Sequence, residues 1–217
     1  MHDHHAAPPA TISTREHWDT FYRERDRVWS GNPNPILVRE AGELTPGTAL
    51  DLGSGEGGDA IWLAGLGWRV TAVDVSQVAL DRAAGHAADA GVGDRITWAR
   101  HDLHTGFPAG RFDLVSAQFL HSQTARPGER DGILRRAADA VAVGGALVIG
   151  SHQGWPSWMD EPPFAHEFPT LEQVQEALAL GDDWQVVTAE LIERDAPGPE
   201  GQPGTRADSV LHLRRLR

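Results

Sequence analysis

The stretch DLGSGEGGDA, residues 51–60, decides the fold of this chain. It directly follows a short apolar segment and opens a helical pattern. Glycines at Gly53, Gly55 and Gly57 let the backbone approach a ligand closely, with the amides of a helix N-terminus nearby. A GxGxxG match alone is weak, since the chain contains 24 glycines. The order of strand, turn and helix strengthens the match, so we predict a ligand-binding turn on an α/β sheet.

Five short apolar segments rich in β-branched residues predict strands, and each is bounded by Gly, Asp or Pro. Helical patterns lie between them, which indicates parallel pairing and a sheet covered on both faces. The segments are TALDLG (48–53), WRVTAVDV (68–75), RITWARHDL (95–103), FDLVSAQFL (112–120) and GGALVIGSH (144–152). Two further segments, at 184–195 and 207–216, flank a Pro/Gly-rich turn and predict an antiparallel hairpin. The predicted fold class is α/β, with a doubly wound, mostly parallel seven-stranded sheet and an antiparallel C-terminal hairpin.

The N-terminal region predicts a short amphipathic helix. Ser13 followed by Glu16 is a capping-box pattern, and the aromatic side chains of Trp18, Phe21 and Tyr22 then fall on one helical face. We expect this helix to form a cap beside the sheet.

Later helices are marked in the same way. Ser76 is the expected N-cap of a helix after the second strand, and Thr170 with Gln173 caps a helix after the fifth. The segment 129–145 predicts a helix whose apolar residues recur at helical spacing through Val141.

The length of 217 residues and the hydrophobic content of 40 % predict one domain. Residues 1–12 are predicted to be a disordered tail, and residues 13–217 a single domain with the N-terminal cap helix. The Pro- and Trp-rich segment 151–169 is long enough for a functional loop, so we predict a lid there. Its aromatic residues, which could select an apolar substrate or merely pack the loop onto the sheet, are Trp155, Trp158, Phe164 and Phe168.

Composition limits the partners. A formal net charge of −12 disfavours nucleic acid, because backbone affinity depends on Lys and Arg. The chain has no apolar stretch of membrane-spanning length and no signal-peptide layout, so we expect a cytoplasmic protein with a small-molecule substrate. Three histidines, His2, His4 and His5, could chelate a metal, but a solvated tail is the favoured interpretation, and no metal site is predicted. An exposed strand edge permits a homodimer without requiring one.

Two aspartates indicate the kind of ligand. Asp74 ends the second strand at the interval where an acidic residue accepts hydrogen bonds from ribose hydroxyls, although it could instead form a turn with Ser76. Asp51 precedes the glycine turn, where a carboxylate would repel a pyrophosphate but would suit the cationic end of a sulfonium cofactor. The pair therefore favours S-adenosylmethionine over NAD.

These motifs resemble a class I S-adenosylmethionine-dependent methyltransferase with its Rossmann-like fold. The resemblance rests on the glycine run at 51–57, Asp74, the HDL triplet at 101–103, FDLV at 112–115 and the antiparallel tail. Trp18, Tyr22 and WSGNPNP, followed by DLGSGEGGDAIWLA, resemble the tellurite-resistance and thiopurine S-methyltransferase group. Membership of that group implies a soft acceptor such as a thiol, a selenol or a metalloid oxyanion, with an O- or N-acceptor as the competing option.

The resemblance also implies roles for individual residues. Asp51, Gly53 and Gly55 would hold the methionine part of the cofactor, with Ser54 binding through its backbone. The other cofactor-binding candidates are Asp74 and Val75 beside the ribose, Asp102 and Leu103 around the adenine, Gln118 beside the methyl group, and Trp29 in the N-terminal cover. In the family the loop after the fifth strand also closes over the cofactor, which points to His152 and Trp155.

Methyl transfer mainly requires alignment of nucleophile, methyl group and sulfur in a water-poor pocket. A hydroxyl or protonated amine acceptor would also need a base. His121 and His152 each follow a predicted strand at its carboxyl end, so they are the catalytic candidates. Two other functions stay open at this point: an NAD-dependent oxidoreductase, and a non-catalytic protein that binds S-adenosylmethionine.

Overall fold

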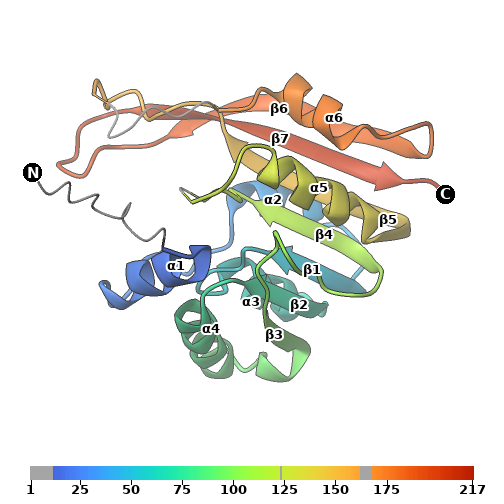
Figure 1. Ribbon diagram of the computed structural model, residues 1–217, viewed down its shortest axis with the longest axis horizontal. Coiled ribbons are helices and arrows are strands. Elements are labelled where there is room, and N and C mark those ends of the chain that lie inside the picture. Colours follow the sequence, from blue (N-terminus) through green and yellow to red (C-terminus); the bar gives the residue numbers. More distant parts are fainter. Residues whose placement is uncertain (1–11, 123, 162–167) are drawn as a thin grey trace, which may run out of the picture.

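A single seven-stranded sheet organises the computed structural model, which describes residues 12–122, 124–161 and 168–217 (Figure 1). The strand order is β3-β2-β1-β4-β5-β7-β6. Neighbours from β3 to β5 are parallel, and β7 pairs antiparallel with both β5 and β6. The strands are β1 (Thr48–Leu52), β2 (Arg69–Asp74), β3 (Ile96–Arg100), β4 (Phe112–Gln118), β5 (Val141–His152), β6 (Trp184–Asp195) and β7 (Thr205–Arg215). The predicted fold class is confirmed.

Helices cover both faces of the sheet, as the alternating pattern predicts. They are α1 (Thr14–Arg23), α2 (Pro35–Ala41), α3 (Gly58–Gly65), α4 (Gln77–Asp89), α5 (Glu129–Asp139) and α6 (Leu171–Leu178). One apolar core lies between the sheet and α5 with α6, and it includes Leu134 and Leu147. The other lies against α2 and α3 and includes Leu37 and Trp68. Within the described ranges, no helix is long and apolar enough to cross a membrane.

The predicted caps are present at three helix starts. Ser13 Oγ accepts a hydrogen bond from the Glu16 amide at 3.2 Å, and Ser76 Oγ accepts one from the Ala79 amide at 3.2 Å. Thr170 and Gln173 form both halves of a capping box. Each bond satisfies an amide that the first turn of a helix leaves without a partner, which fixes where the helix begins.

The predicted strand start at residue 144 and the predicted helix end at residue 145 are wrong, whereas the predicted strand end at His152 is confirmed. α5 ends at Asp139, and Val141 begins β5, where it pairs with Phe112. Val141 is fully buried in the same core as the apolar face of α5, so its helical spacing reflects shared burial rather than continued helix. β5 also continues through Ser151 and His152, so the loop predicted from residue 151 begins at Gln153.

Some predictions fall on residues that the structure does not describe. These are almost the whole predicted N-terminal tail, with its three histidines at positions 2, 4 and 5, and Phe164 of the predicted lid. The part of the tail that is described, Ile12, directly precedes the N-cap of α1.

Candidate active site

A cavity of about 490 Å3 opens at the carboxyl ends of β1 and β4. At this place the strand order reverses, because β2 and β3 lie on one side of β1 while β4 and β5 lie on the other. Ligands of open α/β sheets bind at such switch points. All twelve residues predicted as catalytic or cofactor-binding line this one cavity: Trp29, Asp51, Gly53, Ser54, Gly55, Asp74, Val75, Asp102, Leu103, Gln118, His121 and His152.

The glycine turn between β1 and α3 has a backbone that only glycine adopts readily. Gly53 and Gly55 have φ values of +71° and +52°. A Cβ atom on Gly53 would lie 2.7 Å from Leu120 Cδ1, and one on Gly55 would lie 3.1 Å from the Tyr22 hydroxyl. The turn therefore has no room for side chains at these two positions.

The Ser54 backbone takes part in the fold of the glycine turn. The Ser54 amide donates to Val73 O at 2.9 Å, which anchors the glycine turn to the end of β2. Its hydroxyl is buried and has no hydrogen-bond partner among the described residues. Cofactor binding through the Ser54 backbone stays a prediction.

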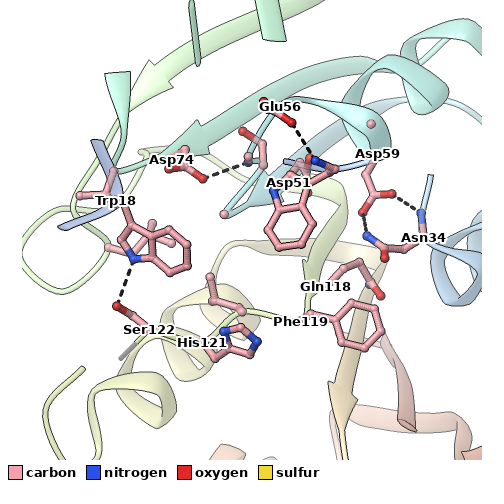
Figure 2. Close-up of a pocket in the computed structure, with 18 of the residues that line it drawn as sticks. Trp18, Asn34, Asp51, Glu56, Asp59, Asp74, Gln118, Phe119, His121 and Ser122 are labelled. Atoms are coloured by element: carbon pink, nitrogen blue, oxygen red, sulfur yellow. Dashed lines mark hydrogen bonds between the residues drawn. The ribbon is translucent and has the colours of Figure 1, made fainter. Parts of the chain in front are cut away.

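Asp74 anchors the same turn through both carboxylate oxygens. Oδ2 accepts from the Gly55 amide and Oδ1 from the Ser76 amide, each at 2.9 Å (Figure 2). Burial raises the pKa of Asp74, while these backbone hydrogen bonds oppose the shift. The turn with Ser76, weighed as an alternative to ribose binding, is thus present, and a ribose would have to share a carboxylate that already holds the turn.

Asp51 is a buried carboxylate that lacks a partner. The residue is 2 % exposed, and Oδ2 has no hydrogen bond with any residue that the structure describes. Burial raises its pKa well above the usual value, and the nearby carboxylates of Asp59 and Asp74 add to the shift. Asp59, by contrast, accepts from the Asn34 amide at 2.6 Å and from the Asn34 side chain at 2.8 Å (Figure 2). An unpaired buried carboxylate facing a cavity suits a cationic ligand group.

Glu56, inside the glycine turn, binds the N-terminal cover. Its Oε2 accepts from the amides of Val28 and Trp29, each at 3.0 Å, and its Oε1 accepts from Arg82 at 2.9 Å. Arg82 also donates to the carbonyls of Tyr22 and Arg25. These hydrogen bonds of Glu56 and Arg82 hold Trp29 at the cavity. The sequence did not predict them, because no local pattern links Arg82 to residues about 60 positions away.

The opposite wall of the cavity carries the two histidines. His152, the last residue of β5, has its Nδ1 2.7 Å from Asp208 Oδ1 and stacks on Phe119 with ring centroids 4.3 Å apart. Its ring centroid lies 5.9 Å from that of His121. Burial lowers the pKa of His152, and the hydrogen bond with Asp208 opposes the shift. Burial therefore favours the neutral imidazole of His152, and Asp208 orients its ring.

Phe119, which belongs to this wall, has a strained backbone conformation. Its φ is +51°, which is unusual for a residue with a bulky side chain. The residue directly follows β4, and its amide donates to Gly150 O on β5 at 2.8 Å. This conformation places the ring beside His152, so Phe119, within the segment 118–121 that the sequence predicts beside the methyl group, helps to shape the wall.

The aromatic lid stays a prediction. Trp155 packs edge-on against Phe168 at 5.5 Å, and Trp158 lies against the 198–204 turn, where it approaches Gly198 and Gly204. None of these three aromatic residues lines the cavity in the ligand-free structure. These contacts match the packing of the loop, the alternative left open above.

The fold and site together define a class I methyltransferase architecture, and comparisons with known proteins agree. Residues 49–145 match the family described as a methyltransferase domain. The 2-heptyl-1-hydroxyquinolin-4(1H)-one methyltransferase of Mycobacteroides abscessus is 33 % identical over 163 residues, which is 71 % of this chain and 69 % of that protein. The chain therefore belongs to the S-adenosylmethionine-dependent methyltransferases.

Two other relatives are named for different methyl-transfer reactions, and a solved structure shares the fold. The ubiquinone biosynthesis O-methyltransferase of Caulobacter sp. (strain K31) is 38 % identical over 104 residues, 47 % of this chain and 39 % of that protein, so the chain spans about two fifths of that relative. Probable thiol methyltransferase 2 of Arabidopsis thaliana is 26 % identical over 134 residues, 60 % of this chain and 59 % of that protein. The N-methyltransferase NodS of Bradyrhizobium japonicum WM9, solved with S-adenosyl-L-homocysteine, has a TM-score of 0.65 at 19 % identity, covering 94 % of this chain and 99 % of that one.

The chemistry of the cavity fits S-adenosylmethionine, the cofactor of this family. The ligand carries an ammonium group, and the cavity presents buried oxygens that lack donors, on Asp51, Ser54 and Gln118. The backbone of the turn at Gly53 and Gly55 also faces the cavity without side chains of its own. The buried oxygens have no donor within the described part of the chain, and this suits the ligand.

Proposed function

We propose that this protein transfers the methyl group of S-adenosylmethionine to a hydroxyl or thiol of a small molecule, with His152 as the general base. The observation that carries the proposal is the pairing of His152 with Asp208 at the cavity wall. A carboxylate at Nδ1 favours the tautomer protonated there, which leaves Nε2 free to accept a proton. Such a base is useful only for an acceptor that must lose a proton.

The residues that we propose for cofactor binding lie on the wall of the cavity opposite His152. We propose that Asp51 binds the ammonium group, that Asp74 and Val75 lie beside the ribose, and that Asp102 and Leu103 frame the adenine. Leu103 is buried, whereas Asp102 is exposed and accepts from the His104 amide at 3.0 Å. Bound S-adenosylmethionine supplies an electrophilic methyl group on a sulfonium. The protein then has to position the acceptor, exclude water and remove its proton.

Two considerations bear on the acceptor atom. The resemblance to the tellurite-resistance and thiopurine group favours a soft atom, as in a thiol, a selenol or a metalloid oxyanion. The relatives named for ubiquinone O-methylation and for a hydroxyquinolinone favour a hydroxyl. Thiols and hydroxyls lose a proton when they are methylated, so the His152–Asp208 pair favours these two kinds of acceptor.

Calorimetric titration tests the cofactor assignment directly. We expect S-adenosylmethionine and S-adenosylhomocysteine to bind at one site and NAD not to bind, because the carboxylates of Asp51 and Asp59 repel a pyrophosphate. A screen of thiols and phenols with the methyl-labelled cofactor should then give turnover. Preference for NAD would overturn the class of ligand. Normal cofactor binding without turnover on any acceptor would favour the non-catalytic alternative.

His121→Gln tests the second histidine. His121 lines the cavity, and its ring centroid lies 5.9 Å from that of His152, so we expect it to orient the acceptor. The variant should lower kcat by roughly tenfold, a modest loss of positioning, and leave the cofactor Kd unchanged. Steady-state kinetics and calorimetry measure the two quantities. Unchanged turnover would remove His121 from the mechanism.

A further inference from the structure

The acceptor wall of the cavity carries positive charge, although the chain as a whole has a formal net charge of −12. Three arginines line the cavity near His152: Arg130, Arg194 and Arg206. The labelled carboxylates of Asp51, Asp59 and Asp74 lie together at the far side from Phe119 and His121 (Figure 2). The cavity is therefore divided into an acidic cofactor side and a basic acceptor side.

Arg130, in the first turn of α5, joins the ends of β4 and β5. Its Nε donates to Leu120 O at 3.1 Å, and its Nη2 donates to Ser151 Oγ at 2.5 Å. Its Nη1 is buried without a hydrogen-bond partner, and no carboxylate of the described chain forms an ion pair with it. A buried guanidinium with a free donor is costly unless an anion completes it.

The two other arginines surround the His152–Asp208 pair. Arg194 Nε donates to Asp208 Oδ2 at 2.6 Å, so this carboxylate is already shared between His152 and Arg194. Arg206 Nε donates only to a carbonyl, Gly154 O at 2.9 Å. Burial lowers the pKa of Arg206, and repulsion from Arg194 adds to that shift although Asp208 opposes it. Asp208 thus serves two guanidinium groups as well as His152, which leaves an excess of positive charge here.

Other acidic side chains near this wall are committed or distant. Glu129 accepts from the Arg126 amide at 3.1 Å and lies 3.7 Å from His104. Asp131 raises the pKa of Arg130 through its charge, against the larger lowering by burial, but does not form an ion pair with it within the described ranges. Neither carboxylate accepts a hydrogen bond from the free Nη1 of Arg130.

We propose that the methyl acceptor is a small organic acid, whose anionic group is bound by Arg130 and Arg206 while its hydroxyl or thiol faces His152. The inference rests on the proposed function and adds the substrate class to it. Guanidinium groups bind carboxylates through paired, charge-assisted hydrogen bonds. Two guanidinium groups near the stacked rings of His152 and Phe119 suit a planar acid. The carboxylates on the cofactor side repel the anionic group of the acceptor, so the acceptor does not bind with that group toward the cofactor.

Paired acceptors, one anionic and one with the carboxylate masked as an ester, test the proposal. 2-Mercaptobenzoate and 2-hydroxybenzoate are compared with their methyl esters, using kcat/KM for each. We expect the wild-type protein to favour the acids by at least tenfold. Arg130→Gln and Arg206→Gln should each remove most of that preference, mainly through KM. Arg135→Gln is the control, because Arg135 lies on the same helix, donates to the Ala177 carbonyl and does not line the cavity.

A binding experiment separates this proposal from the proposed function. Benzoate and benzamide are titrated by calorimetry into the protein saturated with S-adenosylhomocysteine. Benzoate binding that Arg206→Gln weakens at least tenfold, without methylation of any acceptor, would support the anion site and contradict the catalytic proposal. Methylation with no preference for acids over esters would overturn the anion site alone. Arg206→Gln decides the matter if Arg130→Gln does not fold, because Arg206 makes a single backbone contact at the rim.

Discussion

Asp51→Asn is expected to weaken S-adenosylmethionine binding by about 30-fold or more, while making the ligand-free protein more stable. The weaker binding follows because the ammonium group would lose a buried charged partner, and removing one member of such a pair costs about 2–5 kcal/mol. The higher stability follows because the wild-type carboxylate is buried with an unpaired oxygen, and an amide of the same shape is cheaper to bury.

The two effects have opposite signs, so they distinguish a ligand-binding carboxylate from a structural one. Calorimetry gives the cofactor Kd, and thermal unfolding gives the stability of the ligand-free protein. Asp81→Asn, on the exposed surface of α4, is the control and should change neither quantity. A structural role for Asp51 would instead appear as lost stability with little change in Kd, and would contradict the assignment.

The pH dependence of cofactor affinity and of stability also tests the role of Asp51 as a ligand-binding carboxylate. Because burial raises the pKa of Asp51, cofactor affinity should fall on acidification at a higher pH than the titration of an ordinary aspartate. A folded-state pKa above the unfolded value contributes stability at low pH, which is lost as pH rises through the folded-state value. The stability advantage of Asp51→Asn over the wild type should therefore grow with rising pH. Unfolding and calorimetry over a pH series measure both trends, and parallel curves for the two proteins would count against them.

His152→Gln is expected to lower kcat by about a hundredfold or more, the usual contribution of a positioned general base, without changing the cofactor Kd. Asp208→Asn should also lower kcat, because Asp208 orients His152 and fixes its tautomer. Asp208 is a positioning residue, so its effect should also appear in the pH profile. Burial lowers the pKa of His152 and Asp208 opposes that shift, so loss of the carboxylate should move the acid limb of kcat to lower pH.

A second histidine–carboxylate pair provides the matched control. His212, on the same strand as Asp208, has its Nδ1 3.0 Å from Glu40 Oε2, and it does not line the cavity. His212→Gln should reduce stability but leave kcat and its pH profile unchanged. If His152→Gln retains full turnover on the acids and thiols of the screen, His152 is not the base. An unmoved pH profile in Asp208→Asn would reduce Asp208 to a structural role.

The sequence by itself determined the order of strands and helices along the chain, several helix starts and twelve of the residues that line the cavity. These are local features. Alternation of apolar segments sets strand and helix, Ser13, Ser76 and Thr170 supply caps within three residues of the amides they bind, and glycines permit the turn at 53–55. Parallel strands bring their carboxyl ends to one edge of the sheet, so residues just beyond β1, β2 and β4 had to meet there.

Only the tertiary structure decided how the residues of the cavity are paired. His152 and Asp208 are 56 positions apart, and they meet because β7 inserts between β5 and β6 with these two residues in register. Arg130 reaches Ser151, and Glu56 reaches Arg82, through similar long-range packing. A sequence pattern reports which face of an element is buried but not which side chain lies opposite it. The base, its orienting carboxylate and the arginine wall therefore depended on contacts that no local pattern encodes.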